Sequence, residues 1–230
     1  MYAWLKMAAV LIVTAMLTRL TPFSFFFRNV DTLIHELSHA LVTLVLSGKV
    51  RYIYLFSDQS GVTLTSFASA WKGIPISLAG YTGSAMFAVL LFFLFAHRKV
   101  KAGLIVIASL ALIGLLLFVR NNYGMMWSGG FVAVTILVYA FAPSWLRNGY
   151  YLLIAFICLV ESVLSSFTIL SMSFLYPSIA GDATNLSNYT HVPAFVWGIL
   201  FTLFSLWCAK HSTMLLFRKE PEPIDESLGM

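Results

Sequence analysis

The chain has 230 residues, of which 60% are hydrophobic and only 10% are charged, and its mean hydropathy is +0.89. Soluble domains carry about 25% charged residues, so this composition excludes a soluble globular protein and indicates a polytopic membrane protein. The net charge of +5 is spread over short loops and matches no nucleic-acid-binding motif. We therefore expect the lipid bilayer as a partner and expect no nucleic acid.

Seven apolar segments of roughly membrane-spanning length follow one another along the chain. They comprise residues 3–17, 30–46, 74–96, 102–119, 129–142, 150–172 and 192–209. The segment 129–142 is short and the segment 30–46 carries ionisable residues, so either could cross the membrane incompletely. The sequence thus predicts an all-α polytopic membrane protein with six or seven transmembrane helices, located in a bacterial cell membrane.

The two ends of the chain differ in character. The first segment is expected to remain as an anchor, because Lys6 is its only early cation and no small-residue cleavage site precedes Arg19. Residues 1–217 are expected to form a single membrane-embedded domain. Residues 218–230 combine four acids with two prolines, a composition that predicts a disordered acidic tail.

Two histidines and a glutamate occupy the second apolar segment as His35-Glu36-Leu37-Ser38-His39. On a helix the histidines differ by about 40° of rotation and Glu36 lies about 100° from His35, so the three polar groups share one face. This H-E-x-x-H spacing is typical of zinc hydrolases, in which the imidazoles bind the metal and the glutamate acts as general base. Because ionisable groups are costly within an apolar helix, a metal site is favoured over a chance match.

The segment 48–72 has a different pattern from its apolar neighbours. Residues 49–55 alternate in polarity, Gly61 marks a turn, and residues 62–67 are rich in β-branched side chains. This pattern predicts a small β-hairpin directly after the motif helix.

Basic and aromatic residues mark the expected membrane boundaries. The densest basic turn covers residues 97–101, and further cations follow the last span, so the positive-inside rule places both in the cytoplasm. Trp71, Trp127 and Trp145 lie near predicted boundaries, where tryptophan normally acts as an interfacial anchor.

A catalytic zinc site usually takes three protein ligands, so His35 and His39 need a partner from elsewhere in the chain. Outside the tail, four acids remain besides Glu36, and His191 is the chief additional histidine. The candidates are therefore Asp31, Asp58, Glu161, Asp182 and His191.

Most of these candidates have another explanation. Asp31 could cap the motif helix or hydrogen-bond the distal nitrogen of a ligand histidine. Asp58 falls in the predicted hairpin turn, where a solvated aspartate is ordinary. Glu161 falls in mid-span, where it is either protonated and bonded to a neighbouring helix or close to the site. Asp182 lies in a polar break between two apolar segments, which favours it as the third ligand.

These features resemble the site-2 protease superfamily of intramembrane zinc metallopeptidases. The motif helix, the hairpin that begins at Gly48 and a late aspartate contribute to the resemblance. The stretch Asp182-Ala183-x-x-Leu186, followed by Thr190-x-x-Pro193-x-x-x-Trp197, is similar to the late motif of the compact B-like branch. The resemblance covers about residues 30–198, although the Asn-Pro and Asp-Gly signature and the PDZ and CBS modules of the best-known members are absent.

The resemblance implies a Zn2+ ion bound by His35, His39 and Asp182, with Glu36 as catalytic acid and base. Members also carry a glycine-rich segment after the hairpin, and Gly80-Tyr81-Thr82-Gly83-Ser84 occupies that place. Two interpretations remain open for Gly80, Gly83 and Ser84. They either let a substrate approach closely or serve plain helix packing between small residues.

The implied function is an intramembrane zinc metalloprotease that hydrolyses peptide bonds of membrane-protein substrates, with Glu36 activating the water as general base. The predicted hairpin could add a strand to an extended substrate. The alternatives are a catalytically inactive homologue that binds membrane proteins, and a small-solute or proton transporter that uses Glu161 and the histidines as a relay.

The number of segments that cross the membrane between the motif and Asp182 decides whether Asp182 can be the third ligand. If all seven segments cross fully, the start of the motif helix and Asp182 lie on opposite faces of the membrane and cannot share a metal. Either one segment fails to span, or residues 181–190 re-enter the membrane, or His191 or Glu161 is the third ligand. The parity argument therefore predicts a non-spanning element.

Overall fold

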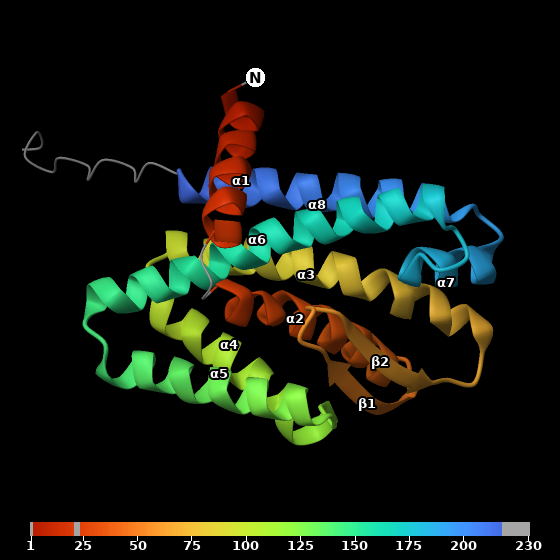
Figure 1. The fold of residues 1–230 in the computed structure, drawn as a ribbon, viewed down its shortest axis with the longest axis horizontal. Coiled ribbons are helices and arrows are strands. Elements are labelled where there is room, and N and C mark those ends of the chain that lie inside the picture. The colour runs from red at the N-terminus through yellow and green to blue at the C-terminus, as the bar shows by residue number, and fades with distance from the viewer. Residues whose placement is uncertain (1, 21–23, 218–230) are drawn as a thin grey trace, which may run out of the picture.

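The computed structural model describes residues 2–20 and 24–217, which form a bundle of helices with a small sheet at one end (Figure 1). The helices are α1 (Tyr2–Leu20), α2 (Ser24–Val45), α3 (Gly73–Ala96), α4 (Val100–Ile113), α5 (Asn122–Phe141), α6 (Ser144–Leu175), α7 (Gly181–Thr190) and α8 (Ala194–Leu216), and the strands are β1 (Lys49–Leu55) and β2 (Gly61–Ser66). A short 3-10 turn (Ala70–Lys72) precedes α3, and a π-helical turn (Gly114–Phe118) extends α4. The acidic tail predicted at residues 218–230 lies outside the described residues.

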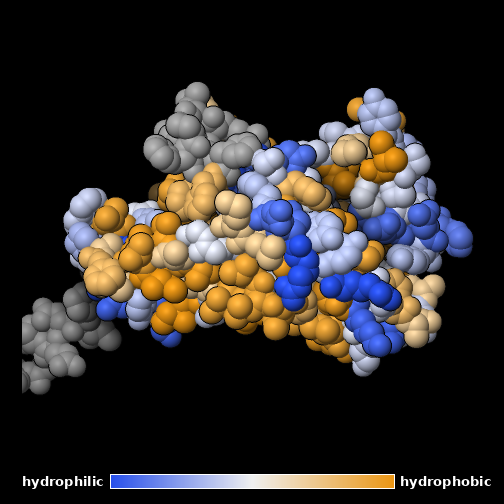
Figure 2. Space-filling model, turned by 60° about the horizontal axis from the view of Figure 1, so that its bottom comes forward, coloured by the Kyte–Doolittle hydropathy of each residue, from blue (hydrophilic) through white to orange (hydrophobic). Residues whose placement is uncertain are grey.

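Five of the described helices are long and apolar enough to cross a membrane, namely α3, α4 with its π-helical turn, α5, α6 and α8. Figure 2 shows apolar side chains over much of the middle of one face. These features confirm an all-α polytopic, integral membrane protein. The expected six or seven spans also counted α1 and α2, which are not among the five. Helix α2 carries Arg28, Asp31 and Glu36, and among the described side chains of α1 the apolar stretch runs over Leu5–Met16.

Helix α5 is longer than the segment 129–142 that hydropathy indicated, because two side chains at its start form hydrogen bonds with α2. The hydroxyl of Tyr123 accepts a 2.7 Å hydrogen bond from Asn29 Nδ2, and Trp127 Nε1 donates to the Phe26 carbonyl at 2.7 Å. Trp127 is therefore part of the core, and its expected role as an interfacial anchor is wrong.

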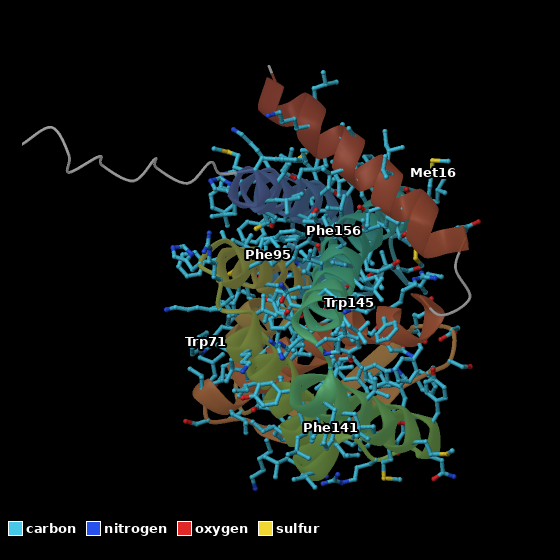
Figure 3. The ribbon with its side chains drawn as sticks, turned by 90° about the vertical axis from the view of Figure 1, so that its left-hand side faces the viewer. Met16, Trp71, Phe95, Phe141, Trp145 and Phe156 are labelled. Carbon is cyan, nitrogen blue, oxygen red and sulfur yellow. The ribbon has the colours of Figure 1, made fainter. Side chains whose placement is uncertain are left out.

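The other two tryptophans remain compatible with an interfacial role. Trp71 and Trp145 are both exposed, Trp71 just before α3 and Trp145 in the first turn of α6 (Figure 3). An indole needs such exposure to reach lipid headgroups.

Helices α2 and α3 occupy the middle of the bundle, with α6 and α8 on one side and α4 and α5 on the other, while α1 crosses over α8 and α6 (Figure 1). Small residues permit close packing at two of these contacts. A Cβ added at Gly83 would overlap Ser38 of α2, and one added at Gly103 would overlap Tyr151 of α6. Close backbone approach is a main source of helix association in lipid.

The predicted hairpin is confirmed, and it is tied to the loop between α4 and α5. Strands β1 and β2 pair antiparallel from Lys49 opposite Ser66 to Leu55 opposite Gly61, and the register shifts between Val50 and Tyr52. Asn121 accepts from the Leu55 amide at 3.1 Å and donates to the Leu55 carbonyl at 2.6 Å. Among the described residues, no strand pairs with the outer edge of β2.

The two ends of the bundle carry different elements. At one end the basic turn at residues 97–101, the start of α6 and the end of α8 surround a common cavity that Arg147 also lines. The two segments that the positive-inside rule assigns to the cytoplasm therefore meet at one end. The hairpin, α7 and the start of α3 lie at the opposite end (Figure 1).

Candidate metal centre

Two imidazoles on α2 face each other at the hairpin end of the bundle. His35 Nε2 and His39 Nε2 lie 3.0 Å apart, and the ring planes are inclined by 80°. His39 Nδ1 lies 2.7 Å from the Ile76 carbonyl, which can only accept, so this nitrogen carries the proton. Nε2, the other ring nitrogen, therefore faces the cluster, and its lone pair is available to a metal when His39 is neutral.

A carboxylate from α7 completes the cluster. Asp182 Oδ2 lies 3.3 Å from His35 Nε2 and 3.2 Å from His39 Nε2. Burial would raise the pKa of Asp182, but the adjacent imidazoles outweigh burial and hold this pKa below its ordinary value. The third member of the cluster is therefore an anion, which suits a cation site.

The donor atoms fit zinc in both type and spacing. A tetrahedral zinc with bonds of about 2.0–2.1 Å has ligand atoms about 3.3 Å apart. The three donors here are separated by 3.0, 3.2 and 3.3 Å. Two imidazoles and one carboxylate also leave a fourth position for water, as catalytic zinc sites do, while iron or manganese accepts similar donors.

The start of α2 removes the parity conflict. Helix α2 begins at Ser24, six residues before the segment 30–46 indicated by hydropathy, so the motif lies in its second half near the hairpin. Helix α7 has ten residues, about 15 Å, and is too short to cross a hydrocarbon core of about 30 Å. The structure therefore contains the expected non-spanning element, and it lies at the same end of the bundle as the motif.

Glu36 lies beside the cluster on the wall of a cavity of about 330 Å³. The same cavity is lined by His35, His39 and Asp182. Glu36 is buried, and its Oε2 accepts a hydrogen bond of 2.6 Å from Thr63 Oγ1. A carboxylate next to three potential metal ligands is suitably placed to act as a general base towards water in the cavity.

The glycine-rich segment divides between two roles. A Cβ at Gly80 would overlap the rings of both His35 and His39, so the absence of a side chain there makes room for the cluster. Gly83 lies against Ser38, and Ser84 Oγ approaches the Asp31 carbonyl at 3.4 Å. Gly83 and Ser84 therefore belong to the packing of α2 against α3.

Neither alternative ligand joins the cluster of His35, His39 and Asp182. Glu161 accepts hydrogen bonds from Arg28 Nε at 2.7 Å and Nη2 at 3.1 Å. His191 caps the end of α7, is exposed and has a left-handed backbone with φ of 59°. The structure thus brings together the ligand set that includes Asp182.

The roles considered for Asp31 are wrong. Asp31 is the eighth residue of α2, too far from its start to act as a cap. The distal nitrogen of His39 is bonded to the Ile76 carbonyl instead. Asp58 lies on the exposed hairpin turn as expected, where hydrogen bonds from the Ser60 hydroxyl and amide lower the pKa of Asp58.

Three neighbours of the site were not identified from the sequence. Thr63 and Gly61 of β2 contact Glu36, and the Tyr81 ring meets the His35 ring edge-to-face with centroids 4.7 Å apart. Tyr81 directly follows Gly80, which was a usable signal. No local pattern indicated the two hairpin residues, because they reach Glu36 only through the packing of the hairpin on α2.

The fold and this cluster together define a polytopic membrane protein with a candidate H-E-x-x-H metal centre. The chain belongs to the Peptidase M50B-like family, whose family model matches residues 5–211, and this confirms the resemblance to the site-2 protease superfamily. No curated protein and no solved structure matches the chain. Peptidases of this family are typically zinc-dependent, and the family also includes inactive members.

Proposed function

We propose that this protein is an intramembrane zinc metalloprotease that hydrolyses peptide bonds in membrane-protein substrates of a bacterial cell membrane. One observation carries the proposal. His35, His39 and Asp182 converge to within 3.3 Å of one another, and Glu36 lines the same cavity. Membership of a peptidase family supports this interpretation.

The residues of the site have separate roles in this proposal. His35, His39 and Asp182 hold the zinc, and the Ile76 carbonyl fixes the orientation of the His39 ring. The bound zinc supplies Lewis acidity that polarises the scissile carbonyl and makes water acidic enough to attack near neutral pH. Glu36 accepts the proton of the attacking water and transfers it to the amine nitrogen as the C–N bond breaks.

The substrate has to be locally extended, because a helical peptide bond is shielded by its own backbone hydrogen bonds. Strand β2 borders the cavity, and in the described part of the chain its outer edge has no strand partner. An extended segment of a membrane protein can add to such an edge through main-chain hydrogen bonds. We therefore propose that the hairpin presents the substrate to Glu36.

The two alternative functions make different predictions. An inactive homologue binds zinc and membrane proteins but cuts none of them. A transporter that uses Glu161 as a proton relay is less consistent with the structure, because Arg28 forms two hydrogen bonds with this carboxylate.

The test compares the wild-type chain with Glu36→Gln, which keeps the shape of the side chain but cannot act as a base. Asp58→Asn is the matched control, because it neutralises an exposed acid on the hairpin turn. Zinc is measured in the purified proteins, and membrane-protein fragments are compared across the proteome of expressing cells. We expect one zinc per chain in all three proteins, with fragments produced by the wild type and Asp58→Asn and missing in Glu36→Gln.

Two results would overturn the proposal. Unchanged fragments in Glu36→Gln would remove the protease function. Zinc retained by a wild-type protein that produces no fragments would favour the binding homologue.

A further inference from the structure

Thr63 on β2 contacts the proposed general base directly. Its Oγ1 lies 2.6 Å from Glu36 Oε2 and 3.1 Å from the Glu36 carbonyl oxygen. A hydroxyl has a single proton to donate, and the charged carboxylate at the shorter distance is the stronger acceptor. Thr63 therefore donates its hydrogen bond to Oε2.

The second oxygen of Glu36 packs against the same strand. A Cβ built at Gly61 would lie 2.7 Å from Glu36 Oε1 and 2.8 Å from Glu36 Cγ. Gly61 and Thr63 are two residues apart, so they share one face of β2. This face thus confines the carboxylate from two positions, by close contact at one and by a hydrogen bond at the other.

The hairpin is held in this position by contacts on both sides. Thr32, one turn before Glu36 on α2, donates to the Gln59 carbonyl at 2.9 Å. On the far side of the sheet, Asn121 bonds both backbone groups of Leu55. Thr63 is therefore presented by an anchored strand, which can fix the orientation of another side chain.

We propose that Thr63 is a positioning residue for Glu36, an inference that rests on the proposed protease function. The hydroxyl holds Oε2 and so keeps the carboxylate in a single orientation, with the other oxygen available for proton transfer. Without this bond the glutamate, which has three side-chain torsions, samples further rotamers. Small displacements of a catalytic group cost a large part of the rate.

Thr63→Val and Thr63→Ser separate the hydroxyl from the shape of the side chain. The full chain is reconstituted in lipid nanodiscs with a pool of transmembrane peptides, and the fastest cleavage is followed by mass spectrometry. We expect kcat of Thr63→Val to fall by about tenfold or more, with KM and zinc content unchanged, and Thr63→Ser to restore most of the rate. Thr168→Val, which removes an exposed hydroxyl on α6, is the matched control and should have the activity of the wild type.

A second readout needs neither metal nor substrate. The infrared difference between metal-free wild type and Glu36→Gln isolates the carboxylate stretch of Glu36. This band should shift in Thr63→Val and stay in place in Thr63→Ser and Thr168→Val. An unshifted band in Thr63→Val, or an equal loss of rate in the valine and serine variants, would overturn the role of Thr63.

The Glu36→Gln and Thr63→Val variants together distinguish failure of this inference from failure of the proposed function. Cleavage by Glu36→Gln at the wild-type rate removes the protease function itself. An inactive Glu36→Gln together with a fully active Thr63→Val leaves the protease function in place and removes only the role of Thr63.

Discussion

Helix α2 contributes to two groups of buried and partly buried ionisable side chains, and the two groups differ in how these side chains are paired. In its second half, His35 and His39 meet Asp182 beside a cavity. Near its start, Arg28 forms two hydrogen bonds with Glu161 of α6. In the first group two imidazole nitrogens and a carboxylate oxygen converge on one point. In the second group the carboxylate is paired with a guanidinium.

This difference separates a ligand site from a structural contact. A carboxylate in an apolar bundle needs a cation or several donors, and the two-point contact with Arg28 supplies both to Glu161. Two imidazoles hold the pKa of Asp182 low, and the nitrogens of these rings are metal ligands once they lose their protons. We therefore interpret the first group as a metal centre and the second as an ion pair that joins α2 to α6.

Removal of His39 should have the largest effect. His39→Ala is expected to lower zinc affinity on the order of 1000-fold, because the roughly 10–16 kcal/mol of a protein zinc site is shared among a few ligands. Titration with a competing chelator measures this affinity. His191→Ala, which removes an exposed histidine, is the control and should bind zinc like the wild type. Wild-type affinity in His39→Ala would contradict the assignment.

Breaking the ion pair should affect stability and leave the metal in place. Arg28→Met is expected to lower the free energy of unfolding by about 3 kcal/mol, because it removes the guanidinium that donates two hydrogen bonds to the Glu161 carboxylate. The double variant with Glu161→Leu should recover part of this loss. Denaturation in detergent gives the stability, and zinc content is measured on the folded fraction. Loss of zinc at unchanged stability would contradict the account, because it would show that Arg28 supports the metal site and not the fold.

Two glycines one turn apart on α3 allow the metal site and the helix packing to be tested separately. Gly80→Ala should weaken zinc binding by about tenfold or more, because its Cβ overlaps the two imidazoles. Gly83→Ala should leave zinc binding unchanged and cost about 1–3 kcal/mol of stability by overpacking against Ser38. Chelator titration and thermal unfolding measure the two effects, and an equal loss of zinc in both variants would argue against the division.

Removal of the Asn121 side chain, which bonds the hairpin at Leu55, should have the smallest effect. Asn121→Ala removes two hydrogen bonds to Leu55 and is expected to cost about 1 kcal/mol. Hydrogen exchange followed by mass spectrometry should become faster in residues 49–55, while zinc binding persists. Unchanged exchange in this strand would show that the hairpin is held in another way.

The sequence predicted the part of the site that depends on local geometry. His35 and His39 could be assigned because a spacing of four places them on one helix face, and Glu36 lies about 100° from His35 on the same helix. Asp182 was selected by the polar break around it and by the family resemblance, since no local period links it to α2. The hairpin followed from its alternating residues, which form a β-ladder as predicted.

The remaining features depend on contacts between distant segments. Hydropathy placed the start of the motif helix near residue 30, because it could not anticipate that Arg28 bonds to Glu161 and that Asn29 donates to Tyr123. The Ile76 carbonyl that orients His39 is a backbone group, which carries no sequence signal. The same holds for Thr63, whose type is ordinary in any strand.

X-ray absorption at the zinc edge of the purified, zinc-loaded chain tests the central claim most directly. We predict a first shell of nitrogen and oxygen atoms at about 2.0–2.1 Å, with the outer-shell scattering of two imidazoles. His39→Ala should reduce the imidazole signal to one ring, and His191→Ala should leave it unchanged. A zinc shell without imidazole scattering, or one unaltered by His39→Ala, would contradict a metal centre formed by His35, His39 and Asp182.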